Sequence, residues 1–150
     1  MPTAEQNEAD IRTFVERVLN QGDIAYAEGL FADGFVEHNP LSPDMGNGRD
    51  AAIASLLALR QLSSDLRFEI LDVVATEDRV GVRSRATGTD DGPGWGAPMG
   101  APATGRSFSV EAIDVVAVGP DGRHTEHYGI VDVPGMLTQL GLMPSGPPPA

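Results

Sequence analysis

The side chains best suited to proton transfer in this sequence are Asp114 and two of the three histidines, His38 and His127. Asp114 lies in the segment 108–118, where every second residue is otherwise apolar, so a single carboxylate interrupts a buried row. Burial without a partner disfavours the charged form, which would suit Asp114 to donate a proton or to act as a base near neutral pH. The structural alternative is that backbone amides satisfy Asp114 or that the opposite face is the buried one.

His127 lies in the next extended segment, TEHYGIVD. A four-residue loop at Gly119–Gly122 would pair Val118 with Arg123. Counting back from that pair sets His127 directly opposite Asp114. A carboxylate bonded to one imidazole nitrogen fixes the tautomer and leaves the other nitrogen free, so the pair predicts His127 as a base. A structural core histidine is the alternative.

The protonation state of Asp114 stays open at this point. Pairing with His127 favours the anion, whereas apolar burial favours the acid, which could stabilise an oxyanion.

His38 ends the extended segment FVEHNP, with Asn39 beside it as a candidate amide donor. We treat His38 as the alternative base, or else as a surface histidine. His124 follows the GPDG turn and is expected to be solvated. The Gly/Pro-rich segment 88–105 is interpreted as a mobile lid over an apolar ligand. The candidate ligand contacts are Trp95, Met99, Tyr26, Phe108 and Gly129.

Composition excludes several chemistries. The chain has no cysteine and its 10 basic residues are all arginine, so thiol nucleophiles, thiolate metal sites and lysine Schiff bases are excluded. The scattered carboxylates and histidines lack the close spacing of metal ligands, and we predict no metal and no cofactor. A net charge of -12 argues against nucleic acid and anionic membranes. The expected partner is a small hydrophobic metabolite, and the absence of a signal-peptide pattern favours a cytoplasmic protein.

Hydrophobic periodicity predicts helices in the first part of the chain. Thr3 and Gln6 have the spacing of a capping box for a helix that ends at Gly22. Asp23 is the expected cap of a second helix that runs through Leu30 and Phe31. A third helix is expected to end near QLSSD, on the spacing of its apolar residues Ile53, Leu56, Leu57 and Leu59.

Strand patterns follow from residue 66, and a change of apolar phase at Leu71 predicts a bulge and a bend. We predict one α+β domain over residues 1–144 and a flexible tail at 145–150. The fold class is a cone, with N-terminal helices packed on a strongly curved, mostly antiparallel sheet that encloses an apolar pocket.

The motifs FVEHNP, GRDA, DLRFEILDVVATEDRVGVRSRATGT, PATGRSFSVEAIDVVAV, DGRHTEHYGIVD and LTQLG occur in the order seen in SnoaL-like polyketide cyclases. The sequence resembles this polyketide cyclase and ester cyclase family over roughly residues 8 to 144. The family belongs to the nuclear transport factor 2-like superfamily, with ketosteroid isomerase and limonene epoxide hydrolase. The resemblance implies an α+β cone, a deep apolar pocket, dimerisation and cofactor-free chemistry in secondary metabolism.

The resemblance is also informative at single residues. The family usually has EHWD where this chain has EHYG, and in the polyketide cyclases that aspartate is the acid/base of an aldol closure; here it is Gly129. His127 matches the family histidine, and Asp114 matches the aspartate of the ID motif, whose counterpart in ketosteroid isomerase resembles an oxyanion-hole acid. The segment around His38 corresponds to the one that supplies the base of ketosteroid isomerase. The resemblance therefore implies that the role has moved to Asp114, His127 or His38, or that the chain has left cyclase chemistry.

Together the residues and the resemblance predict an enzyme that acts on a hydrophobic, carbonyl-bearing or polycyclic metabolite by acid/base catalysis, with cyclisation or isomerisation as the outcome. The resemblance implies that this enzyme is a homodimer. Two alternatives remain. One is an epoxide or ester hydrolase of the same fold, although the arginine-bridged aspartate pair of the epoxide hydrolases has no clear counterpart. The other is a non-catalytic module that binds an apolar ligand.

Overall fold

A computed structural model of the chain describes residues 1–144 and residue 146. The predicted tail at 145–150 lies, apart from Gly146, outside the described residues. The side chain of Met99 also lies outside them.

Helices and strands alternate little along the chain, as expected for an α+β fold. The helices are α1 (Ala4–Phe14), a π-helical turn (Val15–Asn20), α2 (Ile24–Leu30), two short 3-10 turns (Pro43–Met45 and Ala97–Met99), α3 (Arg49–Gln61) and α4 (Val133–Gln139). The strands are β1 (Phe31–Glu37), β2 (Arg67–Ala75), β3 (Arg79–Thr89), β4 (Ser107–Val118) and β5 (His124–Val131).

The predicted helix starts are confirmed. Thr3 and Gln6 form a capping box, in which the Gln6 N–H donates to Thr3 Oγ1 (3.2 Å) and the Thr3 N–H donates to Gln6 Oε1 (2.8 Å). Asp23 caps α2 by accepting the N–H of Tyr26 at 3.1 Å. The predicted end of this helix is wrong, because Phe31 already has extended backbone and begins β1.

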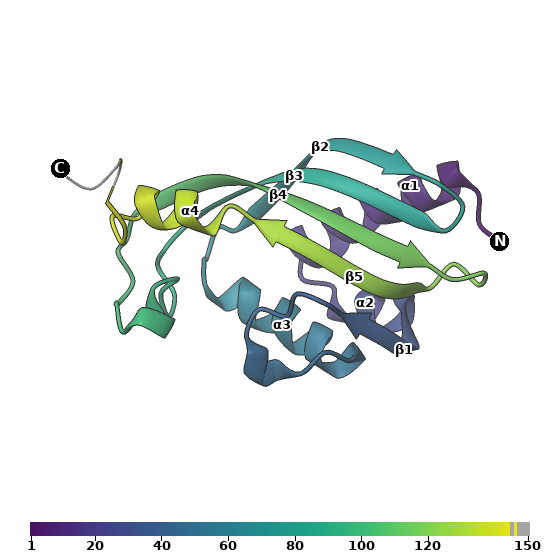
Figure 1. Cartoon of the computed structure of the whole chain (residues 1–150), viewed down its shortest axis with the longest axis horizontal. Coiled ribbons are helices and arrows are strands. Elements are labelled where there is room, and N and C mark those ends of the chain that lie inside the picture. Colours follow the sequence, from purple (N-terminus) through teal and green to yellow (C-terminus); the bar gives the residue numbers. More distant parts are fainter. Residues whose placement is uncertain (145, 147–150) are drawn as a thin grey trace.

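The five strands form one sheet in the order β1-β5-β4-β3-β2, and among the described strands only β1 and β5 pair in parallel (Figure 1). The mostly antiparallel α+β class is therefore confirmed. The predicted bulge in β2 is also present, because the register with β3 shifts between Ile70 and Asp72.

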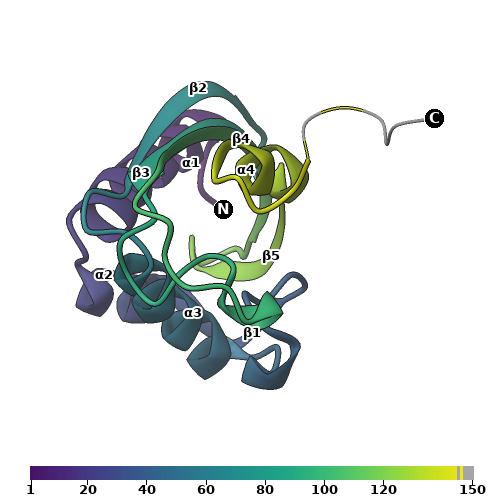
Figure 2. The same ribbon diagram turned by 90° about the vertical axis from the view of Figure 1, so that its left-hand side faces the viewer.

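The helices cover one side of the sheet. α1 contacts β2 and β3, α3 contacts β1, and α4 contacts β4. The end view shows the strands arranged along an arc with the helices completing the ring (Figure 2). On the covered side, alternate residues of β4 are buried, including Phe108, Val110, Ala112 and Val116. Asp114 belongs to this inward row, as its spacing predicted.

The predicted register of β4 and β5 is wrong by two residues. Val118 pairs with His124 rather than with Arg123, so the connecting loop is one residue longer than expected. A bulge then adds a second residue to the slip, because Thr125 has no partner between the pairs on either side of it.

The slip changes which residue faces the central carboxylate. Asp114 pairs with Gly129, and His127 pairs with Val116, two residues further along β4. Because side chains alternate with a period of two, a slip of two leaves His127 on the same face as Asp114. The two side chains are therefore diagonal neighbours rather than direct opposites.

Candidate active site

The inward face of the sheet and the helices enclose a cavity of about 290 Å³. Most of its lining is apolar and comes from α1, β1, α3 and the four antiparallel strands. The titratable and amide side chains in the lining are Glu37, Asn39, Asp114, His124 and His127. A largely apolar cavity with a few convergent polar groups is the usual form of a small-molecule site.

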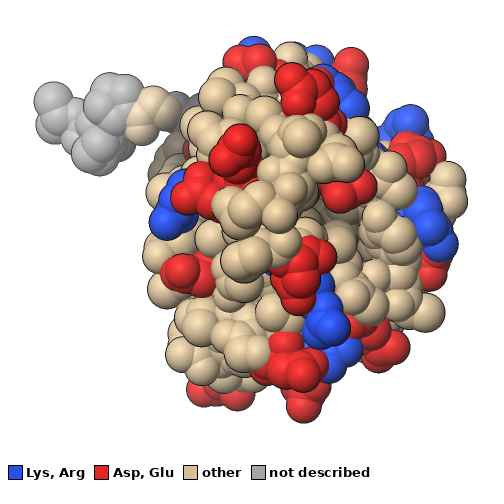
Figure 3. Space-filling model, turned by 90° about the vertical axis from the view of Figure 1, so that its right-hand side faces the viewer, with Lys and Arg blue, Asp and Glu red and all other residues tan. Residues whose placement is uncertain are grey.

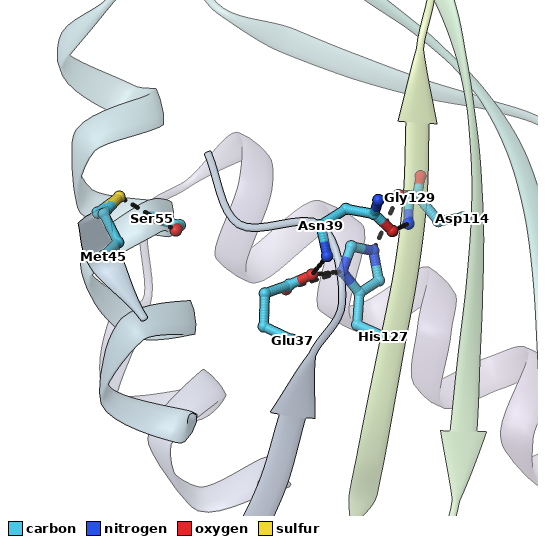
Figure 4. Close-up of polar contacts among 7 residues, drawn as sticks. All are labelled: Glu37, Asn39, Met45, Ser55, Asp114, His127 and Gly129. Atoms are coloured by element: carbon cyan, nitrogen blue, oxygen red, sulfur yellow. Dashed lines mark hydrogen bonds and ion pairs between the residues drawn. The ribbon is translucent and has the colours of Figure 1, made fainter. Parts of the chain in front are cut away.

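His127 lies between two carboxylates (Figure 4). Its Nδ1 is 2.8 Å from Oε2 and 2.9 Å from Oε1 of Glu37, at the end of β1. Its Nε2 is 3.0 Å from Oδ1 of Asp114 on β4. Both ring nitrogens are therefore occupied, and neither is free to take a proton from a ligand.

This arrangement keeps His127 protonated. Burial lowers its pKa, but the hydrogen bonds to Asp114 and Glu37, together with the charges of the two carboxylates, outweigh that effect and raise the pKa from 6.5 to about 9. At neutral pH the residue is an imidazolium that donates one N–H to each carboxylate.

Gly129 makes this contact possible. A Cβ at this position would lie 2.7 Å from Oδ1 of Asp114 and 2.9 Å from Cε1 of His127. Both distances are shorter than packed atoms allow, so any side chain here would displace the imidazole or the carboxylate. The glycine that weakens the strand therefore provides the space through which His127 reaches diagonally to Asp114.

Asn39 is the remaining polar group beside the carboxylates. Its backbone N–H donates to Oε1 of Glu37 at 2.9 Å, and its side-chain Oδ1 accepts the N–H of Gly129 at 3.0 Å. A peptide N–H can only donate, so the amide oxygen must face Gly129. The side-chain NH₂ is thereby left as a hydrogen-bond donor in the cavity lining (Figure 4).

Five of the residues predicted for the site line the cavity: Asp114, His127, Gly129, Trp95 and Phe108. Trp95 and Phe108 meet edge to face, with ring centroids 5.5 Å apart. Among the described residues, the indole N–H of Trp95 is buried without a hydrogen-bond partner.

The structure places His38 and Tyr26 outside this lining. His38 is exposed, with its Nε2 2.9 Å from Glu126 and its ring stacked 4.0 Å from that of Tyr128. Tyr26 packs against the cluster around Val18, with the guanidinium carbon of Arg17 4.2 Å from its ring centroid. The predicted contact Met99 has its side chain outside the described residues.

Sequence reasoning missed two of the titratable residues that line the cavity. Glu37 could have been found, because it is two residues after the buried Phe35 in a strand and therefore shares its inward face, whereas His38 must point outward. His124 was predicted to be solvated, which is wrong: it is 4% exposed. The bulge at Thr125, which sequence alternation does not reveal, turns His124 inward.

The segment between β3 and β4 is tied down at its base by Asp90, which is fully buried. The carboxylate accepts the backbone N–H of Trp95 at 2.9 Å, and the N–H and hydroxyl of Thr104 at 2.8 Å and 2.9 Å. These contacts position Trp95 against the cavity.

Acidic side chains are prominent on the face formed by the hairpin ends (Figure 3).

Within residues 1–144 and 146, no group of three His, Cys, Asp or Glu side chains could hold a metal ion. The helices of that same part of the chain are all too short or too polar to cross a membrane.

Comparison with solved structures identifies close matches of the whole fold. TsrD from Streptomyces laurentii is 25% identical, with a TM-score of 0.77 over 91% of this chain and 96% of that chain. Wild-type IdmH from Streptomyces antibioticus, described as a putative polyketide cyclase, is 30% identical, with a TM-score of 0.74 over 91% of this chain and 99% of that chain. A putative SnoaL-like polyketide cyclase from Jannaschia sp. CCS1 is 22% identical, with a TM-score of 0.78 over 96% of this chain and 97% of that chain. At this identity the similarity supports the fold and not the activity.

No curated protein matches the sequence. The family model described as SnoaL-like polyketide cyclase matches residues 9–140, which includes Glu37, Asp114, His127 and Gly129. The chain belongs to the SnoaL-like polyketide cyclase family.

Proposed function

We propose that this protein is an acid/base enzyme that removes a proton next to the carbonyl group of a hydrophobic, ring-containing metabolite and so promotes cyclisation or isomerisation. The observation that carries the proposal is the placement of His127 between Glu37 and Asp114 in an apolar cavity. Membership of a family described as polyketide cyclases supports the same type of reaction.

Asp114 is the base in this proposal. Its Oδ1 is held by His127, and its Oδ2 has no hydrogen bond from the described residues. The carboxylate is 33% exposed and lines the cavity, so a bound ligand can reach it. His127 acts as a fixed cation that orients Asp114 and compensates its charge, and not as the base.

Asn39 supplies a hydrogen bond to the oxygen of the resulting enolate. Its amide is oriented by Gly129, so the NH₂ is in place before charge develops on the ligand. A preorganised donor of this kind stabilises the transition state without a reorganisation cost, and removing one typically lowers rates by about 100-fold or more. Asp114 then takes the proton from carbon while Asn39 stabilises the oxygen on which negative charge develops.

Electrostatics restrict the ligand. With His127 protonated, two carboxylates and one imidazolium leave the site with an excess negative charge, and none of the described lining residues is an arginine. An anionic ligand would therefore be repelled and poorly compensated in an apolar cavity. Neutral ketones and esters are the ligands that fit this site.

Proton abstraction can be measured without knowing the natural substrate. In D₂O, ¹H NMR follows the loss of the α-hydrogens of 1-tetralone, a bicyclic ketone. The wild-type protein is expected to accelerate this exchange, and Asp114→Asn should slow it by about 100-fold or more because the base is lost. His38→Gln is the matched control and should exchange at the wild-type rate, because His38 lies on the outer surface. An Asp114→Asn variant with wild-type exchange would refute the proposal.

A further inference from the structure

His124 is a buried polar residue that the proposed reaction does not use. It is the first residue of β5 and lines the end of the cavity next to the β4–β5 hairpin. Its ring lies beside Phe14 and Phe31, with centroids 5.7 Å and 6.1 Å away. Neither ring nitrogen forms a hydrogen bond with any described residue, although the side chain is only 4% exposed.

The imidazole is neutral at physiological pH. Burial, with a smaller contribution from the positive charge of His127, lowers the pKa of His124 from 6.5 to about 4. A neutral imidazole carries one N–H donor and one acceptor nitrogen. Among the described residues only the indole nitrogen of Trp95 is a fully buried polar atom without a partner, so the ring nitrogens of His124 are accessible from the cavity. A ligand oxygen that bonds one of them takes the place of a water contact in otherwise apolar surroundings.

The position of His124 sets a distance from the reacting end of the cavity. His124 pairs with Val118, which is four residues from Asp114 along β4. Four residues of strand span about 13 Å. Side chains stand roughly perpendicular to a sheet, so the two functional groups keep about this separation. Subtracting two contacts of about 3 Å each leaves about 7 Å between the ligand atoms that would meet the two groups. A fused bicyclic ring system has about this length.

We propose that His124 is a second polar anchor of the cavity, which binds a neutral hydroxyl or keto oxygen at the far end of a fused-ring ketone whose reacting carbonyl lies at Asp114. This inference rests on the proposed function, because it takes the cavity as the substrate site. The neutral imidazole can donate to a ketone or accept from a hydroxyl, so either oxygen substituent is recognised. A carboxylate at the same position is rejected, since no arginine among the described residues lines the cavity to compensate its charge.

Two ketones test the anchor: 1-tetralone, which has only the reacting carbonyl, and 6-hydroxy-1-tetralone, which adds a hydroxyl at the opposite end. Their Kd values are measured by calorimetry with wild-type protein, His124→Leu and His124→Gln. In His124→Leu the Kd of the hydroxyketone should rise about ten-fold, and that of 1-tetralone should change less than about two-fold. His124→Gln keeps a donor and an acceptor and should restore part of the difference.

Phe108→Leu is the matched control. It alters the apolar wall without touching a polar group, so it should weaken both ketones by the same factor. Equal effects of His124→Leu on the two ketones would overturn the inference, as would failure of the wild-type protein to prefer the hydroxyketone. The α-proton exchange of 1-tetralone is measured separately. If His124→Leu weakens binding of the hydroxyketone alone, but the wild-type protein catalyses no exchange, the proposed reaction is refuted and the anchor is supported.

Discussion

At the scale of single residues, the site depends on Gly129, because this residue has no side chain. Gly129 lies opposite Asp114, and the imidazole of His127 occupies the space that a Cβ would take. The aspartate that the resemblance implies at this position would need this same space. A side chain at position 129 and the contact between His127 and Asp114 therefore exclude each other sterically. This chain has the contact and a glycine at position 129.

Gly129→Ala tests this exclusion. The added Cβ would lie 2.7 Å from Oδ1 of Asp114, so the His127–Asp114 contact must open. We expect the pKa of His127 to fall, because one of its two carboxylate partners is lost, and the exchange of 1-tetralone to slow about ten-fold or more. Gly34→Ala is the control, because a Cβ there would meet no atom within 4 Å. Wild-type exchange in Gly129→Ala would contradict the steric account.

Part of the site was predictable from residue types alone. The lone carboxylate in an apolar row correctly identified Asp114 as inward facing, and its contact with His127 was expected. The role of Glu37 was overlooked because attention fell on its neighbour His38. Whether His127 is a base or a fixed cation depends on how many carboxylates contact it. The sequence indicated the contact with Asp114 but not the one with Glu37, which requires the long-range pairing of β1 with β5.

At the scale of elements, the site is assembled by one parallel and one antiparallel pairing. β1 pairs with β5 and brings Glu37 beside His127, and β4 supplies Asp114 from the other side. The predicted β4–β5 register was wrong because a longer loop and a bulge each added one residue. The register differed by two residues, an even number, so the predicted face of His127 was still correct.

Asp90 provides a prediction about the loop that carries Trp95. Its buried carboxylate accepts three hydrogen bonds from Trp95 and Thr104. Asp90→Asn replaces one acceptor oxygen by a donor, so we expect a loss of about 3 kcal/mol in the free energy of unfolding, measured by urea denaturation. Hydrogen exchange of the loop amides should speed up in the same variant. Asp121→Asn, at an exposed position, should leave both unchanged; equal stability of the two variants would show that Asp90 does not organise the loop.

At the scale of the whole molecule, the fold class followed from periodicity, because helix and strand patterns are segregated along the chain. The cavity could be anticipated but not its second polar anchor, since the orientation of His124 depends on the bulge at Thr125. Long-range pairings set the register and the bulges, and local sequence carries little information about them.

Two histidines give stability opposite dependences on pH. The pKa of His127 is raised from 6.5 to about 9, so its contribution is complete below pH 6.5 and is lost as the pH rises through about 9. The pKa of His124 is lowered to about 4, so its contribution is complete above pH 6.5 and is lost as the pH falls through about 4. Each of these two contributions to the free energy of unfolding is about 3 kcal/mol.

Urea denaturation as a function of pH measures these contributions. Relative to the wild-type protein, His127→Gln should remove the decline in the free energy of unfolding on the alkaline side of pH 6.5. His124→Leu should remove part of the decline on the acid side. Wild-type pH dependence in both variants would contradict the assigned protonation states.

The most direct test of the account is the protonation of His127. The chain has three histidines, so a His38→Gln/His124→Leu double variant leaves His127 as its only one. ¹⁵N NMR of this variant should show both ring nitrogens protonated at neutral pH and a titration near the pKa of about 9 that its two carboxylates impose. A neutral ring at neutral pH, titrating at or below 6.5, would contradict the central claim, because His127 would then be free to act as the base that we assign to Asp114.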